Sequence, residues 1–507
     1  MIGLVERTMA SRALPAVVEE VEWPRDITDW FRRLAALRGL LFLDSARPDP
    51  LLGRYSYLTA DPFETIRSRQ GRVQVARPGH DRDVIEVQGD PLQVLRGRLG
   101  RWSLDSVAGL PPFQGGAAGL LSYDLCHHIE RLPRPRFDEF EAPDLAVGLY
   151  DWVLALDQLR RQAWIISTGF PETEPRRQLC RAEDRLTRVM GWLAGQELTG
   201  LEITDCGWRI DRAGNQRSAI SNQQSLLAPQ WPVPGPAGLT SNFSREGYLR
   251  AVERAIEYIY AGDVYQVNLS QRLLFPLNES PVELYLRLRE RNPAPFAGYF
   301  DTGEHVIASS SPERFLGLLD GEVETRPIKG TRPRWPTPEA DMYSAGELRE
   351  SDKDRAENVM IVDLLRNDLG RVCEYGSVRV ADPLRLESYE FVHHLVSEVR
   401  GRLRPGLGPI DLLRAAFPGG SVTGAPKVRA MEIIAELEPT ARGPYCGSLG
   451  YIGFNGAMDS NILIRTFTCG RGWIQFPVGG GIVAQSIPER EYEETLHKAE
   501  GMIRALN

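Results

Sequence analysis

The segment Glu324-Thr-Arg-Pro-Ile-Lys-Gly-Thr-Arg-Pro-Arg334 combines one lysine, three arginines, one glycine and two prolines within eleven residues. Pro327 and Pro333 each fix the backbone angle φ and lack an N–H donor, while Gly330 permits a sharp turn or a close approach to a ligand. We therefore expect a stiff loop that holds Lys329 in a defined place among groups that bind anions.

The chemistry expected of Lys329 depends on the loss of its proton. The ordinary lysine pKa of about 10.4 makes the free amine rare at neutral pH. Arg326 and Arg332 stand three residues away on either side, and both neighbouring positive charge and desolvation lower such a pKa. The segment therefore predicts a nucleophilic lysine, and the alternative is a solvated basic turn without a chemical role.

The composition is that of an ordinary globular protein. The 507 residues include 42% hydrophobic and 25% charged side chains, which suits a large core in two domains or in one shared body. The formal net charge of −8 gives no general attraction to nucleic acid. An acidic chain that binds an anion must concentrate its positive charge locally, as the segment around Lys329 does.

The cysteine pattern and the hydropathy indicate a cytoplasmic protein. The six cysteines show no C-x-x-C pair and no metal-ligand spacing, so we expect reduced thiols and no zinc site. No apolar run approaches the 18 residues of a membrane-spanning helix. We therefore expect no membrane association.

A proline-rich stretch divides the chain. Four prolines and one glycine fall within residues 229–236, which is typical of a linker. We predict an N-terminal domain over residues 1–228, a linker over 229–242 and a second domain over 243–507. The first domain has a mixed pattern of strands and helices. It includes an apolar, strand-like run over residues 145–156, broken mainly by Asp151, and a hairpin expected over residues 152–166.

The second domain carries periodic patterns of both kinds. Ser244 can cap a helix over the residues that follow it, because their apolar side chains recur at helical spacing. A strand expected over residues 264–275 places Gln266, Asn268 and Ser270 on one face. That polar face either meets water or lines a site.

Two predicted helices carry acidic side chains that could share a cation. Glu357 belongs to a helix expected over residues 353–370, and Glu494 to a helix that follows Pro488. Magnesium typically takes one or two protein carboxylates and fills its other positions with water and substrate oxygens. The alternative is that both carboxylates are simply solvated on helix surfaces.

Eight sequence blocks occur in an order that is similar to the chorismate-binding enzyme family, which includes anthranilate, aminodeoxychorismate, isochorismate and salicylate synthases. The resemblance covers residues 243–500, and shorter matches over 43–57 and 112–116 extend it toward the N-terminus. It implies an α+β fold in which two antiparallel β-sheets pack as a sandwich with outer helices. The blocks are Gly262-Asp-Val-Tyr-Gln-Val-Asn-Leu-Ser270, Ser311-Pro-Glu-Arg314, Pro327-Ile-Lys-Gly-Thr331, Ala356-Glu-Asn-Val-Met-Ile-Val-Asp-Leu-Leu-Arg-Asn-Asp-Leu-Gly370, His394-Leu-Val-Ser397, Gly420-Ser-Val-Thr-Gly-Ala-Pro-Lys427, Ile464-Arg-Thr466 and residues 479–494.

The resemblance assigns the two negative charges of chorismate to different groups. Glu357 and Glu494 would hold Mg²⁺, which would bind the ring carboxylate. One metal and one bidentate guanidinium would thus divide the charge of the dianion. The enolpyruvyl carboxylate would be bound by a set of side chains and backbone N–H groups: Arg465, Tyr445, Gly479, Gly480 and Gly481.

Further residues would surround the reacting ring. Glu313 would act as the general acid for the departing C4 hydroxyl, with His394 near it. The ring itself would be lined by Thr325, Ser421 and Thr423.

Two positions discriminate among the reactions of this family. Relatives that add water to chorismate carry a lysine base where this chain has Gln266, and an amide cannot take a proton from water. Anthranilate synthases usually carry alanine where this chain has Lys329, whereas the common aminodeoxychorismate synthases carry lysine. The resemblance therefore implies amination of chorismate to 4-amino-4-deoxychorismate, for 4-aminobenzoate and folate biosynthesis, through a covalent Lys329 intermediate.

Two other functions compete with this one. Anthranilate synthase component I is the nearer alternative, and its products would be anthranilate and pyruvate. A non-catalytic partner or amino-acid sensor with an inherited fold would be expected to lose its polar residues. The acid, the metal ligands and the arginine are all present, which disfavours the second alternative.

Two binding partners besides chorismate are implied. No cysteine lies in the Gly-x-Cys-x-Gly setting of a glutaminase, so a separate glutamine amidotransferase subunit would supply the ammonia. Asp44 and Ser45, with Pro293, resemble the tryptophan pocket of anthranilate synthases. Asp44 and Ser45 would meet the α-amino group of a bound tryptophan, and the alternative is that they cap a loop.

Overall fold

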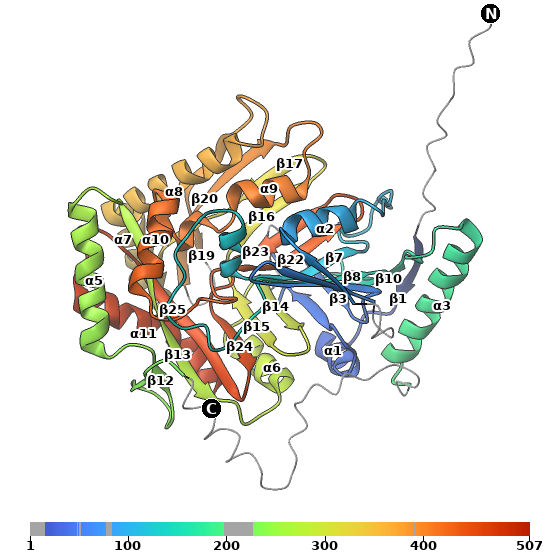
Figure 1. Ribbon diagram of the computed structural model, residues 1–507, viewed down its shortest axis with the longest axis horizontal. Coiled ribbons are helices and arrows are strands. Elements are labelled where there is room, and N and C mark those ends of the chain that lie inside the picture. The colour runs from blue at the N-terminus through green and yellow to red at the C-terminus, as the bar shows by residue number, and fades with distance from the viewer. Residues whose placement is uncertain are drawn as a thin grey trace, which may run out of the picture.

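Two antiparallel β-sheets pack face to face, and helices cover their outer faces (Figure 1). The computed structural model describes residues 16–47, 49, 52–77, 84–196, 227–388 and 392–506. The expected α+β sandwich with outer helices is therefore confirmed. The N-terminal domain over 1–228 falls partly outside the described residues, and the domain boundaries stay a prediction.

Within the described residues, the first sheet has thirteen strands in the order β1-β10-β9-β3-β2-β14-β15-β24-β25-β13-β12-β11, and β21 pairs with β13 beside this path. Its strands are β1 (Val17–Val21), β2 (Leu41–Asp44), β3 (Tyr55–Thr59), β9 (Trp152–Asp157), β10 (Gln162–Ser167), β11 (Trp231–Pro232), β12 (Thr240–Ser241), β13 (Gln266–Pro276), β14 (Phe296–Asp301), β15 (Val306–Ser311), β21 (Gly424–Ala425), β24 (Thr466–Gly470) and β25 (Trp473–Ile482).

The second sheet has twelve strands among the same residues, in the order β18-β20-β17-β16-β23-β22-β7-β8-β4-β5-β6, and β19 pairs with β20. Its strands are β4 (Glu64–Arg69), β5 (Arg72–Ala76), β6 (Ile85–Gln88), β7 (Gly116–Leu121), β8 (Leu145–Tyr150), β16 (Arg314–Leu319), β17 (Glu322–Thr325), β18 (Ile328–Pro333), β19 (Arg379–Ser388), β20 (Val392–Arg402), β22 (Ser448–Gly453) and β23 (Met458–Asn461).

The helices are α1 (Ile27–Leu34), α2 (Pro91–Leu99), η1 (Tyr123–His128), α3 (Pro175–Leu193), α5 (Arg245–Tyr260), α6 (Pro281–Arg291), α7 (Pro338–Glu350), α8 (Asp352–Gly370), α9 (Pro409–Ala416), η2 (Gly420–Val422), α10 (Lys427–Leu437) and α11 (Pro488–Ala505). No helix in the described part of the chain is long and apolar enough to cross a membrane. The five cysteines there are all free thiols, and Cys206 lies outside the described residues.

Strands from distant parts of the chain alternate in both sheets. In the first sheet β2 pairs with β14, which sets Leu43 opposite Gly298. In the second sheet β7 pairs with β22, which sets Leu120 opposite Leu449. Even the predicted linker contributes, because β11 and β12 join the edge of the first sheet. The two halves of the chain therefore build one shared body.

The apolar run over residues 145–156 forms two strands that belong to different sheets, β8 and β9. The residue between them, Asp151, is fully buried, and its carboxylate pairs with Arg181 and Arg185. The run is therefore not one strand, because it separates into two at Asp151. The expected hairpin over residues 152–166 is confirmed, since β9 pairs antiparallel with β10. A buried charge with two arginine partners marks the point where the chain crosses from one sheet to the other.

Alternating side chains fill the space between the sheets. In β7, Ala118 and Leu120 pack in the cluster between the sheets, whereas Ala117 and Leu121 pack beneath the outer helices. A strand buried on both faces needs apolar side chains in both sets of alternate positions. This explains why every residue of β7 is buried.

Two elements predicted near the site are confirmed. The helix after Ser244 is α5, and the Ser244 hydroxyl accepts a hydrogen bond from the Gly247 N–H at 3.0 Å. The polar strand is β13, whose Gln266, Asn268 and Ser270 are all buried. This face does not meet water, which leaves the other prediction, that it lines a site.

The segment around Lys329 is not the loop that its prolines suggested. It forms β17 and β18, which pair with consecutive stretches of β20. A bulge lies between Lys329 and Thr331, where Gly330 has a φ of 78°. The loop prediction is wrong because the two prolines interrupt the hydrogen-bond ladder only locally, and β20 pairs with the residues between them.

Leu120→Ala tests the packing between the sheets. Leu120 is fully buried, so we expect the free energy of unfolding to fall by about 2–5 kcal/mol, because the substitution leaves a cavity. Leu159→Ala is the matched control, since Leu159 is 46% exposed and should change stability little. Equal effects of the two variants in urea denaturation would contradict this description of the core.

Candidate active site

Lys329 lies half-buried in β18, with its side chain directed at η2. Its Nζ donates a hydrogen bond to the Ser421 carbonyl oxygen at 2.9 Å. Burial lowers the pKa of Lys329, while the nearby carboxylates of Glu357 and Glu313 act to raise it. The flanking arginines are paired with carboxylates of their own. Of the two causes predicted from the sequence, burial lowers the pKa of Lys329, whereas the charge of the flanking arginines does not contribute.

Glu313 lies in the turn between β15 and β16, and it is 5% exposed. Its Oε1 accepts a hydrogen bond from the Ser421 hydroxyl at 2.7 Å. Burial raises the pKa of Glu313 to about 7, although the Ser421 hydrogen bond and the charge of Lys329 act to lower it. A carboxyl group with this pKa keeps a proton near neutral pH and can donate it.

Ser421 joins these two groups. Its carbonyl oxygen accepts from the Lys329 amine while its hydroxyl donates to the Glu313 carboxyl. The turn that carries it is fixed by Thr423, whose hydroxyl donates to the Gly419 carbonyl oxygen at 3.1 Å. An amine and a carboxylic acid are therefore held on opposite sides of one residue.

A buried ion pair supports the same turn and was missed from the sequence. Arg442 donates to the Val422 and Asn268 carbonyl oxygens at 3.0 and 2.7 Å, and it pairs with Glu438 at 2.7 Å. Both charged side chains are buried. Their separation of four residues in the sequence could have suggested the pair, but not the carbonyl oxygens that it holds.

Carboxylates of α8 and α11 gather near Lys329, with two more lysines among them. Lys353 Nζ lies 3.9 Å from an oxygen of Glu357 and 3.9 Å from one of Glu491. Lys498 pairs with Glu494 at 2.7 Å. Burial raises the pKa of Glu357. Burial also acts to raise the pKa of Glu494, but Lys498, Lys353 and Lys329 together outweigh it, so that pKa is lowered. Sequence reasoning missed both lysines, although each lies four residues from its carboxylate.

The residues present fit the Mg²⁺ that the resemblance implies. No group of three or more metal-ligating side chains is preassembled within the described ranges, but magnesium needs only one or two protein carboxylates. The Lys353 ammonium already sits between carboxylates of two helices, so the site attracts a cation. A Cβ on Gly480 would lie 3.3 Å from Glu491 Oε2, which shows how closely β25 approaches these oxygens.

Arg465 is half-buried, and among the described residues no carboxylate pairs with its guanidinium. Burial lowers its pKa. A partly desolvated charge without a partner is unfavourable, so the position suits an anionic ligand. Burial, and next the charge of Arg465, lowers the pKa of His394 to about 3, so His394 is neutral at physiological pH. Tyr445 is buried beside Arg442, whose guanidinium lies 5.7 Å from its ring.

The side-chain amide of Gln266 contacts the glycine run Gly479–Gly481. A Cβ on Gly481 would lie 1.8 Å from Gln266 Nε2, so any larger residue there would displace the Gln266 amide. Gln266 Oε1 and Asn268 Nδ2 are buried without a hydrogen-bond partner in the described part of the chain. Such atoms call for a ligand or water. The glycine run lies within β25, and its Gly479 carbonyl oxygen accepts a hydrogen bond from Lys498 at 2.9 Å.

The hydroxyl groups of the other predicted ring-lining residues already donate hydrogen bonds within the protein. The Thr325 hydroxyl donates to the Phe315 carbonyl oxygen at 2.6 Å, and Thr423 donates to the backbone of its own turn. The structure brings Lys329, Ser421 and Glu313 into direct contact. The substrate contacts of all these residues stay predictions.

The candidate tryptophan pocket lies beside a cavity of about 550 Å³ between the two sheets. Asp44 and Ser45 line this cavity, whereas Pro295 lines it in place of the predicted Pro293. The Asp44 carboxylate already accepts hydrogen bonds from Arg289 at 2.6 Å and from the Tyr285 hydroxyl at 2.9 Å. Tryptophan binding stays a prediction, and an amine ligand would have to share this carboxylate.

Glu313→Gln tests the raised pKa without any assay of activity. The folded protein holds this proton more tightly than the unfolded chain, whose pKa is near 4.3, so ionisation costs the wild type stability as the pH rises toward 7. Glutamine carries no charge, so we expect the variant to gain about 1–3 kcal/mol over the wild type at pH 8 and far less at pH 5. Urea denaturation at both pH values measures this, and a gain independent of pH would contradict it. Glu290→Gln, on an exposed site, is the control.

Comparison with known proteins gives the site a context. The family described as chorismate binding enzyme matches residues 53–504. Anthranilate synthase component 1 of Thermus thermophilus is 42% identical over 452 residues, which cover 87% of this chain and 90% of that protein. Aminodeoxychorismate synthase component 1 of Escherichia coli is 39% identical over 494 residues, which cover 97% and 98%.

A solved structure agrees with these relatives. The crystal structure of anthranilate synthase component I from Streptococcus pneumoniae has a TM-score of 0.71 and 30% sequence identity, and the match covers 90% of this chain and 93% of that chain. Relatives with two different activities thus occur at similar identity. The chain belongs to the chorismate-binding enzyme family.

Proposed function

We propose that this chain aminates chorismate at C4, as the large component of an aminodeoxychorismate synthase. The observation that carries the proposal is the half-buried amine of Lys329, which shares Ser421 with the carboxylic acid of Glu313. Nucleophile and proton donor are both poised for a ligand between them. The product would be 4-amino-4-deoxychorismate, from which 4-aminobenzoate and folate are made.

The reaction would proceed by two substitutions. In the first, the neutral Lys329 amine bonds to C2, the ring double bonds shift, and the C4–O bond breaks as Glu313 gives its proton to the hydroxyl, which leaves as water. In the second, ammonia bonds to C4, the double bonds shift back, and the C2–Nζ bond breaks. The proton lost by Nζ in the first step restores Glu313, and the proton lost by the new C4 ammonium releases the neutral lysine.

The remaining site residues would hold the substrate. Arg465 would pair with the enolpyruvyl carboxylate, because its guanidinium has no carboxylate partner within the described residues. Mg²⁺, when bound by Glu357 and Glu494, would supply positive charge for the ring carboxylate. Orienting the ring against the amine contributes about 7 kcal/mol or more in favourable cases.

Ammonia would come from a second subunit. Both relatives named above are called component 1, and the sequence has no glutaminase cysteine motif of its own. We infer a glutamine amidotransferase partner. Free ammonium salts should replace this partner in the test tube.

Anthranilate synthase is the second candidate, because the Thermus relative with that name is 42% identical. That reaction adds ammonia at C2 and releases pyruvate. Lys329 counts against it, since a neutral amine beside the ring would compete with ammonia for C2.

The products of the wild type and Lys329→Ala, with chorismate, Mg²⁺ and ammonium, test the proposal. We expect the wild type to form 4-amino-4-deoxychorismate and the variant to lose at least about 100-fold in rate, because the nucleophile is gone. Any residual amination in the variant should place nitrogen at C2, since a single substitution delivers it there. Liquid chromatography with mass spectrometry separates the products.

Lys329→Arg is the control for charge. It keeps a cation at this position but has no usable lone pair at neutral pH, so it should be as inactive as Lys329→Ala. Anthranilate and pyruvate from the wild type would contradict the proposal and favour the second candidate.

A further inference from the structure

Cross-strand ion pairs run along one face of β17 and β20. Glu322 lies opposite Arg402 and Glu324 opposite Arg400, and each pair forms a salt bridge. Opposite charges directly across antiparallel strands favour the pairing that brings them together. This ladder of charges therefore favours one register between the two strands.

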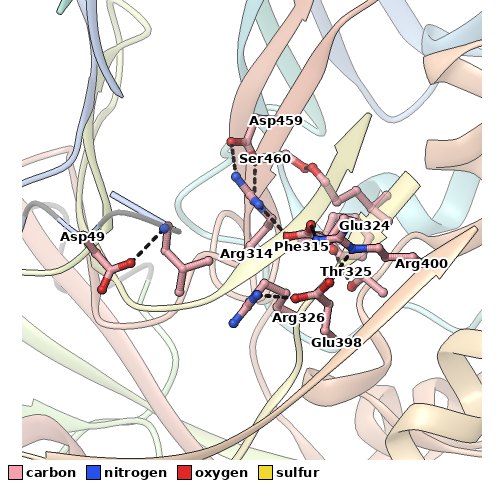
Figure 2. Close-up of polar contacts among 12 residues, drawn as sticks. Asp49, Arg314, Phe315, Glu324, Thr325, Arg326, Glu398, Arg400, Asp459 and Ser460 are labelled. Atoms are coloured by element: carbon pink, nitrogen blue, oxygen red, sulfur yellow. Dashed lines mark hydrogen bonds and ion pairs between the residues drawn. The ribbon is translucent and has the colours of Figure 1, made fainter. Parts of the chain in front are cut away.

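Arg326 extends this ladder, but here the positive charge belongs to the segment after β17 and the negative charge to β20. The pairs Thr325–Val399, before the break between β17 and β18, and Ile328–Val396, after it, follow the same register. Arg326 therefore stands opposite Glu398 of β20. Arg326 Nη1 donates to Glu398 at 2.5 Å, and Figure 2 shows the two side chains pointing at each other. Arg326 Nη2 donates at 2.5 Å to Glu387 of β19. One guanidinium thus ties the segment between β17 and β18 to both β19 and β20.

The register changes just beyond this point, at the bulge between Lys329 and Thr331. Side chains alternate between the faces of a strand, so a bulge placed before Lys329 would turn its side chain to the opposite face. Arg326 and Lys329 are three positions apart and belong to opposite faces. As long as Arg326 stays paired with Glu398, the side chain of Lys329 therefore points to the sheet face that carries the active site.

Burial makes this constraint stronger than that of the neighbouring ion pairs. Arg326 is 5% exposed and Glu398 is 7% exposed. Glu398 would keep Arg400 of its own strand as a partner, but a shifted register would separate the buried Arg326 guanidinium from both of its carboxylates, which is strongly unfavourable. The Glu322–Arg402 pair has side chains that are 54% exposed, and exposed pairs contribute little.

We propose that Arg326 is a positioning residue for Lys329, because its pairs with Glu398 and Glu387 fix the strand register that directs the lysine at η2. This inference rests on the proposed function, which gives Lys329 its chemical role. It adds a residue that never touches the substrate yet determines whether the nucleophile is in place.

The scarcity of lysine makes the proposal measurable. The whole sequence contains four lysines: Lys329, Lys353, Lys427 and Lys498. Competitive acetylation with acetic anhydride over a range of pH, followed by peptide mass spectrometry, gives the apparent pKa and reactivity of each one. This readout needs no turnover, so it is independent of which product the enzyme makes.

Arg326→Lys and Arg402→Lys are the matched pair of variants. Lysine keeps the charge but cannot bridge two carboxylates as arginine does. We expect Arg326→Lys to raise the apparent pKa of Lys329 by about one unit, which is about tenfold less free amine at pH 8. We expect kcat to fall by about 10–100-fold with little change in KM for chorismate, because the reacting group is misplaced. Arg402→Lys should change neither quantity.

Glu398→Gln is the second variant, and it removes the partner charge while Arg326 stays. It should shift the labelling of Lys329 in the same direction as Arg326→Lys. If both variants lower the thermal midpoint but leave the pKa of Lys329 unchanged, Arg326 only stabilises the sheet and the inference is wrong. A wild type that fails to aminate C4 would instead overturn the proposed function, and the labelling result would still decide the role of Arg326.

Discussion

Burial of Lys329 and Glu313 beside η2 is the constraint on which the site depends. Desolvation disfavours whichever form of a group is charged, so it lowers the pKa of Lys329 and raises that of Glu313 to about 7. The same environment thus shifts both groups toward their neutral forms, the amine of Lys329 and the carboxylic acid of Glu313. Ser421 holds the two groups near each other by bonding to both. In water at neutral pH both groups would be charged.

The shared body of the protein explains how such a site stays in place. Its parts come from β13, β18, β25, η2, α8 and α11, which are distant in sequence but adjoin in the fold. Two buried ion pairs hold the backbone around the site: Arg442 with Glu438 behind the η2 turn, and Arg326 with Glu398 behind β18. Separating the partners of such a pair leaves buried charge uncompensated, which disfavours other arrangements of the backbone.

Much of this could be predicted from the sequence, for identifiable reasons. The helix after Ser244 and the strand of Gln266 follow from local periodicity and capping. Lys329 could be singled out because prolines, a glycine and arginines surround it in the sequence. That it lies in a β-strand could not be predicted, because β20 supplies the pairing from more than sixty residues away. Asp151 was visible as an interruption, yet its role as a crossing between sheets depends on Arg181 and Arg185.

The central claim is that Lys329 becomes covalently attached to the ring of chorismate. The most direct test is intact-protein and peptide mass spectrometry after incubation with chorismate and Mg²⁺, with ammonia withheld. Without ammonia the second substitution cannot follow, so we expect an adduct of chorismate minus water on the Lys329 peptide, which disappears when ammonium is added. An enzyme that turns over normally with ammonium, yet shows no such adduct when rapidly quenched, would contradict the account.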